Sequence, residues 1–154
     1  MPDAPIPARL YHGSATPFEP GFVLTPRGEE YEENWGGTDF YAALERWRPD
    51  GATAHRDAVF LVGDPDDVDL AGGSTDWCLE VEPTGPVTRH DINWGSEISC
   101  LRGDGKGIED PEVRRAALAY WAGEAHPNES VWEYLAPGAR VLSCEPWETF
   151  GMAP

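Results

Sequence analysis

Glycine and proline interrupt this chain so often that they limit the folds open to it more than any other feature. The 154 residues include 17 glycines and 15 prolines, and both residue types favour turns over the interior of a helix or strand. The sequence therefore predicts many turns and short elements rather than a helical bundle. Seven tryptophans and an apolar fraction of 40% can fill one core, so we expect a single domain over residues 1–154.

Short apolar runs mark the expected strands, and capping residues mark the expected helices. Strands are predicted at residues 9–12, 22–24, 58–62, 77–82 and 139–144, and residues 131–135 fit either a strand or a helix. Helices are predicted at residues 38–47, just after Asp64-Pro65, and at 111–122 between the cap Asp110 and the stop Gly123. Residues 29–37 show no clear period, so we expect a loop there. The pattern is typical of an α+β domain.

The charge of the chain restricts its partners. There are 28 acidic and 11 basic residues, giving a formal net charge of -17. Such a field repels phosphate backbones and anionic lipid, so we expect neither a nucleic-acid partner nor a membrane partner. The first residues lack the basic and apolar regions of a signal peptide, and no apolar run approaches the roughly 20 residues that span a bilayer.

The three cysteines suggest a reducing environment. Cys78, Cys100 and Cys144 are odd in number and widely spaced, which matches neither a disulfide framework nor a zinc pattern. We therefore expect no bound metal and a cytoplasmic location.

Two short motifs point to a family. Tyr11-His12-Gly13-Ser14 closes the first apolar run, and Glu82-Pro83-Thr84-Gly85-Pro86 closes a later one. In this order they resemble the ADP-ribosyltransferase superfamily, most closely the small bacterial enzymes that transfer ADP-ribose to rifampin. The resemblance implies a split β-sheet core with short helices. It also implies NAD+ as co-substrate, release of nicotinamide, and an acceptor, a small molecule or a protein, that the sequence does not identify.

The resemblance assigns the NAD+-binding residues to two expected strands. In the first, His12 would hold a ribose hydroxyl of NAD+ and Gly13 would let the backbone approach the nicotinamide amide, with Tyr11 and Ser14 beside them. In the middle motif, Phe60 stands where the family usually has a tyrosine. A phenyl ring keeps the stacking face and loses the hydroxyl.

Two carboxylates compete for the catalytic position. Asp91 follows the Glu82 to Pro86 motif at nearly the spacing of an aspartate in the rifampin-modifying enzymes. Glu133 resembles the superfamily's catalytic glutamate, because a turn and a last expected strand follow it. A fixed negative charge stabilises the oxocarbenium-like ribose that forms as nicotinamide leaves. We favour Glu133 over Asp91, since Trp132 and Tyr134 on either side would partly bury its charge.

Three other interpretations stay open. An inactive binding module would keep the fold and lose the reaction, and Phe60 in place of tyrosine supports this alternative. A NAD glycohydrolase would use the same residues with water as the acceptor. An unrelated acidic interaction or inhibitor protein would bind a basic partner, and that binding would be sensitive to salt.

Overall fold

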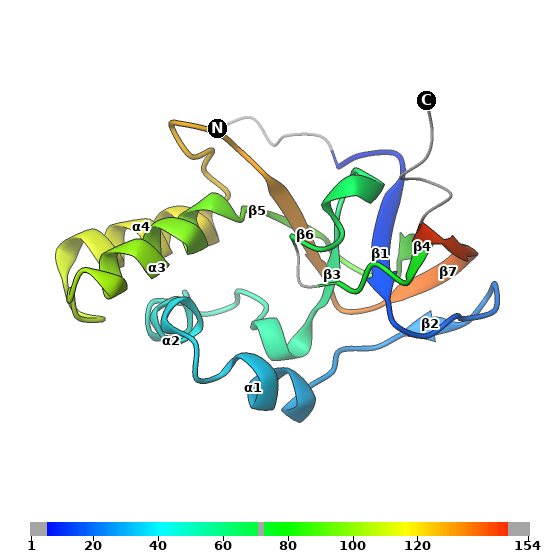
Figure 1. The fold of residues 1–154 in the computed structure, drawn as a ribbon, viewed down its shortest axis with the longest axis horizontal. Coiled ribbons are helices and arrows are strands. Elements are labelled where there is room, and N and C mark those ends of the chain that lie inside the picture. Colours follow the sequence, from blue (N-terminus) through cyan, green and yellow to red (C-terminus); the bar gives the residue numbers. More distant parts are fainter. Residues whose placement is uncertain (1–5, 71–72, 148–154) are drawn as a thin grey trace. The chain divides into compact units, whose positions relative to one another are not determined.

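The computed structural model describes residues 6–70 and 73–147, which form a mixture of helices and strands (Figure 1). The strands are β1 (Leu10–Ser14), β2 (Val23–Leu24), β3 (Val59–Leu61), β4 (Trp77–Pro83), β5 (Thr88–Asp91), β6 (Trp132–Ala136) and β7 (Ala139–Pro146). The helices are α1 (Glu29–Trp35), α2 (Asp39–Arg46), α3 (Asn93–Gly103) and α4 (Pro111–Ala122), with the 3-10 helices η1 (His55–Asp57) and η2 (Pro65–Asp67). The predicted α+β class is confirmed.

The chain folds as two compact units, each assembled from segments that are distant in the sequence. The first unit comprises Met1–Thr25, Val59–Arg89 and Glu133–Pro154, and the second comprises Pro26–Ala58 and His90–Trp132. The expectation of one domain over residues 1–154 stays a prediction.

A four-stranded sheet forms the centre of the first unit. Its order is β1-β4-β7-β2, and each neighbouring pair runs antiparallel. Cys78, Leu79 and Val81 of β4 are buried against the rest of the core. The register of β4 and β7 shifts between Glu80 and Val81, which leaves Leu142 of β7 as the extra residue of a β-bulge. A three-stranded sheet follows the order β3-β6-β5, with β3 and β6 antiparallel.

The turn after β4 interlocks with the turn between β6 and β7. The Thr84 amide donates to the Gly138 carbonyl over 3.0 Å. A Cβ added to Gly138 would lie 2.6 Å from Thr84 Oγ1, and one added to Gly85 would lie 2.6 Å from Pro137 Cγ. Both glycines are therefore required by close packing between the two turns. The Glu82 to Pro86 motif has this structural role whatever its part in function.

Helix α4 in the second unit follows its sequence signals closely. The Asp110 side chain accepts a hydrogen bond from the Glu112 amide, and Gly123 ends the helix at a φ of 74°. Glycine reaches this left-handed conformation without a steric penalty. One face of the helix is buried, including Val113, Ala116 and Tyr120, as the helical spacing predicts.

Two helices depart from the sequence analysis. The prediction of a loop at residues 29–37 is wrong, because Glu29–Trp35 forms α1. Three glutamates occupy its first turn, where they interact favourably with the helix dipole, and its one buried residue, Tyr31, anchors it to the core. Helix α3 was not predicted, because its low amphipathicity and internal Gly95 weaken the periodic signal.

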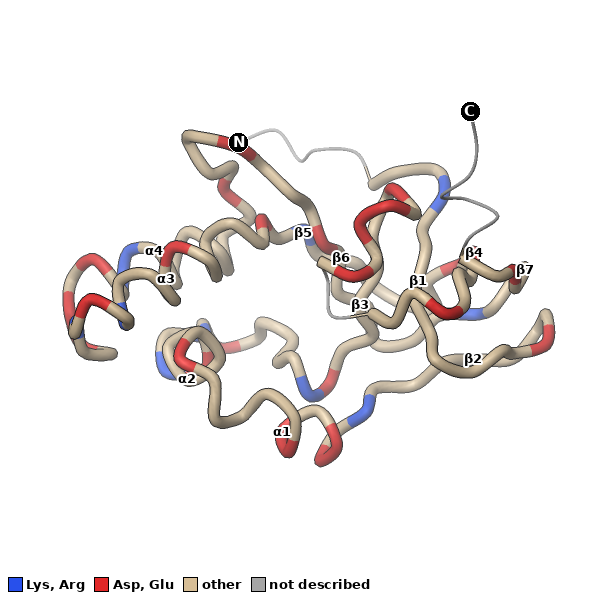
Figure 2. The backbone as a smooth tube through the Cα atoms, viewed as in Figure 1, with Lys and Arg blue, Asp and Glu red and all other residues tan. Residues whose placement is uncertain are grey.

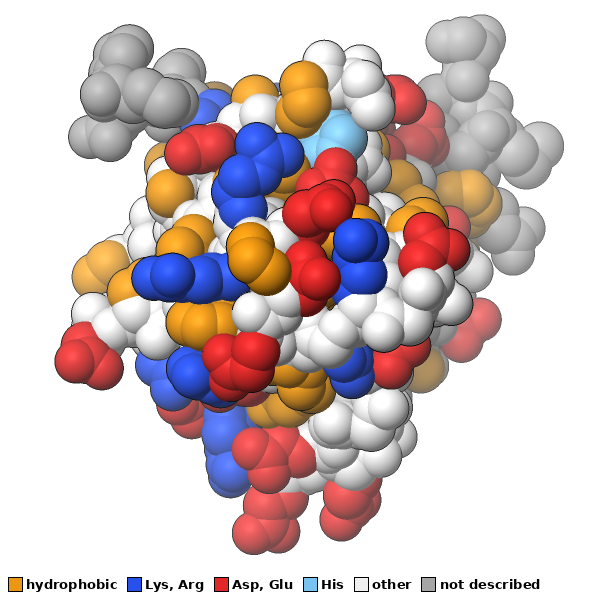
Figure 3. Space-filling view, turned by 90° about the vertical axis from the view of Figure 1, so that its left-hand side faces the viewer, with side chains coloured by type: hydrophobic (Ala, Val, Ile, Leu, Met, Phe, Trp, Pro, Cys, Tyr) orange, Lys and Arg blue, Asp and Glu red, His pale blue; other side chains and the backbone are white. Residues whose placement is uncertain are grey.

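Acidic residues are spread over both units of the described backbone (Figure 2). On the face drawn in Figure 3, basic and acidic side chains are interspersed rather than segregated. Ion pairs within the second unit join basic and acidic groups, among them Arg46–Glu109, Arg48–Glu45, Arg56–Glu32, Arg102–Asp39 and Lys106–Glu112. Among residues 6–70 and 73–147, no helix has both the length and the apolar character needed to cross a bilayer.

Candidate functional site

Strands β1 and β3 of the first unit meet at a single point and do not continue as a ladder. The Tyr11 amide donates to the Val62 carbonyl over 2.8 Å, and the Val62 amide donates to the Tyr11 carbonyl over 2.9 Å. This isolated bridge leaves the following residues of β1 and the preceding residues of β3 without backbone pairing to each other. The region beyond the bridge contains His12, Gly13 and Phe60, three of the predicted site residues.

His12 connects β1 to β3 with its side chain. Its Nδ1 lies 2.8 Å from the Phe60 carbonyl oxygen. Because a carbonyl only accepts, Nδ1 carries the hydrogen, and in a neutral ring Nε2 is then the acceptor. The half-buried imidazole is thus held in one tautomer and one orientation.

The backbone N–H and C=O groups of Gly13 lie on the edge of β1 that meets β3. The N–H and the C=O of Tyr11 both bond to Val62. Because backbone groups alternate between the two edges of a strand, those of Gly13, two residues further along, point to the same edge as those of Tyr11. The missing Cβ faces elsewhere. A Cβ there would collide with the Ser74 carbonyl oxygen and lie 3.0 Å from Val68 Cβ. Glycine is therefore needed at this position for packing against Ser74, which is a reason that the sequence did not reveal.

Phe60 and Glu133 lie on one face of the three-stranded sheet. Phe60 pairs with Leu135 in the β3–β6 register, and Glu133 lies two residues before Leu135, so alternation places Glu133 on the same face. Such diagonal neighbours are typically about 7–8 Å apart between Cα atoms. Glu133 is only 5% exposed, whereas Phe60 is partly exposed. The carboxylate predicted to be catalytic therefore lies beside the predicted stacking ring.

Asp91, the competing carboxylate, belongs to the second unit and is completely buried. Its Oδ1 accepts hydrogen bonds from the backbone amides of Asn93 over 3.0 Å and Val131 over 3.1 Å. Its Oδ2 accepts one from the His126 amide over 2.7 Å. One carboxylate thus fixes the start of α3 and both ends of the segment from residue 126 to residue 131. These bonds give Asp91 a structural function.

Tyr11 and Ser14 have structural contacts of their own. Tyr11 is 8% exposed and packs with Val62, Val68 and Cys78. The Ser14 hydroxyl donates to the Thr16 carbonyl over 2.6 Å and accepts from the Thr16 amide over 3.1 Å. Ser14 therefore caps the turn that follows β1.

The second unit contains a buried cluster of aromatic and histidine side chains. His55 Nδ1 lies 3.0 Å from the Tyr31 hydroxyl, and its Nε2 lies 2.6 Å from the Tyr120 hydroxyl. Burial lowers the pKa of His55 to about 3 and also lowers the pKa of His90, whose Nδ1 donates to the Tyr120 carbonyl. Both rings are therefore neutral at pH 7 and belong to the core.

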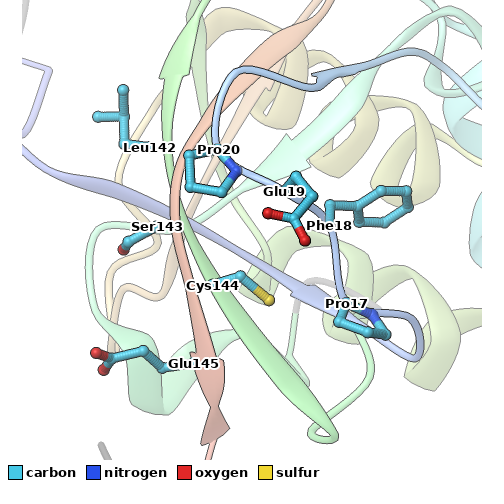
Figure 4. A pocket seen from close by; sticks show the side chains of 8 residues that line it. All are labelled: Pro17, Phe18, Glu19, Pro20, Leu142, Ser143, Cys144 and Glu145. Carbon is cyan, nitrogen blue, oxygen red and sulfur yellow. The ribbon is translucent and has the colours of Figure 1, made fainter.

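A pocket in the first unit was not anticipated from the sequence (Figure 4). It has a volume of about 410 Å³ and lies between the loop at residues 17–20 and the segment of β7 at residues 142–145. The available signal was a proline-flanked aromatic and acidic loop, Pro17-Phe18-Glu19-Pro20, directly after the predicted site strand. No group of three or more potential metal-ligating side chains occurs in the described part of the chain.

Comparison with known proteins found no similar protein. Neither a family model, nor a curated protein, nor a solved structure matches this chain.

Proposed function

We propose that the first unit binds NAD+ and transfers its ADP-ribose to an acceptor, with release of nicotinamide. The observation that carries this proposal is the 2.8 Å hydrogen bond between His12 Nδ1 and the Phe60 carbonyl. It fixes the imidazole between β1 and β3, next to the N–H and C=O groups of Gly13 on the same edge of β1. The proposal includes the finer fold assignment, an ADP-ribosyltransferase-like split sheet.

The residues beside the isolated Tyr11–Val62 bridge could each contact a different group of NAD+. In the proposal, His12 Nε2 accepts a hydrogen bond from a ribose hydroxyl, and the Gly13 peptide pairs with the nicotinamide carboxamide, which both donates and accepts. The partly exposed ring of Phe60 stacks on nicotinamide without contributing a hydroxyl. A cytoplasmic location, where NAD+ is present and the three cysteines stay reduced, is part of the proposal.

Glu133 is the proposed catalytic carboxylate. Its buried charge stabilises the positive charge that develops on the ribose, and burial strengthens this interaction. The hydroxyl oxygen of the acceptor attacks C1′ of that ribose. The bond from C1′ to nicotinamide breaks, nicotinamide leaves with the electron pair, and the hydroxyl proton passes to the Glu133 carboxylate. Asp91 has no step in this proposal, because its two oxygens already bind three backbone amides.

The proposal is tested by incubating the protein with NAD+ and measuring nicotinamide by chromatography, with His12→Ala and His12→Asn in parallel. The asparagine amide can still donate to the Phe60 carbonyl but lacks the second ring nitrogen. We expect both variants to lose most nicotinamide release, and His12→Asn to keep the thermal stability of the wild type. Loss of nicotinamide release without loss of thermal stability in His12→Asn would show that His12 acts in NAD+ binding and not only in holding β3 in place.

Two outcomes would contradict the proposal. Undiminished release by both variants would remove His12 from the site. Absence of both NAD+ binding and nicotinamide release in the wild type would favour the acidic interaction protein. Binding without release, even after acceptors are added, would support the inactive module that Phe60 suggests.

A further inference from the structure

The four-stranded sheet of the first unit has one buried face and one face that is partly open to solvent. Side chains alternate between the two faces along each strand, and directly paired residues share a face. Val81 and Val141 lie on the buried face, each no more than 3% exposed. The other face carries a row that crosses three strands, Val23, Arg140 and Glu82, and all three side chains are exposed. We call this second face the outer face.

The bulge in β7 adds an apolar side chain to the outer face. In a regular strand, Leu142 and Ser143 would project to opposite faces. Instead Leu142, Ser143 and Glu145 all project to the side away from the loop at residues 17–20, whereas Cys144 projects toward that loop (Figure 4). Leu142 is 45% exposed, and Val23 is 40% exposed. The outer face therefore presents two aliphatic side chains whose contact with a partner would remove apolar area from water.

Carboxylates accompany these aliphatic side chains on the outer face. Glu80 pairs with Ser143, and Glu145 lies two residues beyond Ser143 on β7. The two glutamates are therefore diagonal neighbours, which are typically about 7–8 Å apart. Glu82 lies directly opposite Arg140, so this arginine offsets one of the three negative charges.

The covered end of the outer face adds further negative charge. Tyr11 and Cys78 lie on this face, opposite Glu80 and Glu145 in the strand register, and they pack with Val68, which follows η2. Val68 is surrounded in the sequence by four acidic residues: Asp64, Asp66, Asp67 and Asp69. The open part of the outer face thus continues into an acidic segment, and both repel anions and attract cations.

The dimensions of the open part suit a short chain segment. It spans β4, β7 and β2, which are about 4.8 Å apart, and the stretch Arg140–Glu145, which is roughly 20 Å long. The resulting area of roughly 300 Å² is well below the roughly 800 Å² that each partner contributes to a standard protein–protein interface. Apolar side chains beside a polar and charged rim are the usual composition of such interfaces.

The charge of the outer face selects the kind of segment. A second copy of this chain would bring the same three glutamates against each other, and an acidic segment would be repelled in the same way. A basic segment is attracted by these glutamates and, at longer range, by the formal net charge of -17.

We propose that the outer face is a docking surface for a basic segment of a partner protein, in which lysine or arginine side chains flank at least one aliphatic or aromatic side chain. The basic side chains contact Glu80, Glu82 and Glu145, and the apolar side chain covers Leu142 and Val23. This inference stands on the sheet alone and does not depend on the proposed transferase activity.

The docking surface is tested by fluorescence anisotropy with three labelled peptides of ten residues. The first has four lysines and two leucines among glycines and serines, the second has serine in place of both leucines, and the third has glutamine in place of the lysines. We expect the first to bind about fivefold more tightly than the second and at least about tenfold more tightly than the third. Raising the ionic strength from 0.05 to 0.3 M should weaken its binding about fivefold.

Two pairs of substitutions with the same change in charge locate the binding. Glu80→Gln with Glu145→Gln should weaken binding of the first peptide about fivefold. Glu30→Gln with Glu33→Gln, which alters two exposed carboxylates of α1 in the second unit, should change it less than about twofold. Equal effects of the two pairs would show attraction by net charge alone and would overturn the docking surface. Absence of binding by the wild type at millimolar peptide would overturn it as well.

Leu142→Ser isolates the apolar contact. We expect binding of the leucine peptide to weaken about fivefold and binding of the serine peptide to stay unchanged, because only the first can contact Leu142 with an apolar side chain. Val23→Ser is a second variant with the same expectation. Both side chains are exposed, so neither change should affect folding, which thermal unfolding verifies. Equal weakening for the two peptides, or none for either, would contradict the apolar contact.

Discussion

At the scale of single residues, the two buried carboxylates, Asp91 and Glu133, lie in different units. Asp91 accepts hydrogen bonds from three backbone amides, and all three belong to the second unit. Glu133 is a side chain of a regular strand, on the same sheet face as Phe60. A carboxylate that satisfies several buried amides cannot be removed without leaving those donors unpaired.

We therefore predict that Asp91→Ala lowers the free energy of unfolding by about 3–5 kcal/mol, measured by urea denaturation. Asp91→Asn should lose about 1–3 kcal/mol, because its carbonyl oxygen can still accept from two amides while its amide group opposes the third. Asp110→Ala is the matched comparison, because that half-buried cap accepts one hydrogen bond and its loss should cost about 1 kcal/mol. A loss for Asp91→Ala no larger than for Asp110→Ala would contradict the structural function.

At the scale of elements, the buried cluster around His55 connects α1, η1 and α4. Tyr31 contributes from α1 and Tyr120 from α4, and each hydroxyl meets one nitrogen of His55. The Trp121 indole nitrogen adds a hydrogen bond to the Leu44 carbonyl of α2 over 2.9 Å. Four elements of the second unit thus depend on a core that excludes the charged form of histidine.

This core makes stability depend on pH. The folded pKa of His55 is about 3, below the usual histidine value of 6.5, chiefly because burial penalises the charged ring. Below pH 6.5 the unfolded chain binds a proton that the folded protein does not, so stability falls by about 1.4 kcal/mol per pH unit until the folded pKa is reached. Above pH 6.5 this contribution is constant.

The prediction is checked by urea unfolding at pH 7.5, 6.0 and 4.5, in the wild type and in His55→Gln. Glutamine can hydrogen-bond both tyrosines but does not titrate in this range. The variant should start less stable and lose less stability than the wild type between pH 7.5 and pH 4.5. Parallel stability curves for the two proteins would contradict the assignment to His55.

Element boundaries show how far the sequence determines this structure. The apolar runs at Leu10 and Val59 and the caps around α4 are local signals, and they predict β1, β3 and α4. The Asp91 side chain accepts from the first amide of helix α3 and also from the amides of His126 and Val131, which are 35 and 40 positions further along the chain. Local sequence patterns therefore do not reveal this helix. The pocket likewise joins two segments more than 120 residues apart. Only the fold brings such residues together.

At the scale of the whole molecule, both units carry excess negative charge. The segments of the first unit contain 12 acidic and 3 basic residues, and those of the second contain 16 and 8. The proposed site for an anionic dinucleotide therefore lies in the unit with fewer basic groups. Its field repels the NAD+ pyrophosphate.

Salt should therefore strengthen the binding of NAD+. Raising the ionic strength from 0.01 to 0.15 M shortens the Debye length from about 30 to about 8 Å. We expect the KM for NAD+, measured from steady-state nicotinamide release, to fall about two- to threefold. A KM that rises over this range would contradict the electrostatic account.

The measurement that tests the central claim most directly is the kcat of nicotinamide release by Glu133→Gln, with Glu82→Gln as the control. Glu82 is an exposed carboxylate on β4, so its replacement should leave kcat unchanged. Glutamine at position 133 keeps the size of the side chain and removes its charge. The account predicts a 10²- to 10³-fold fall in kcat with little change in KM. A kcat within about twofold of the wild type would show that Glu133 is not the catalytic carboxylate.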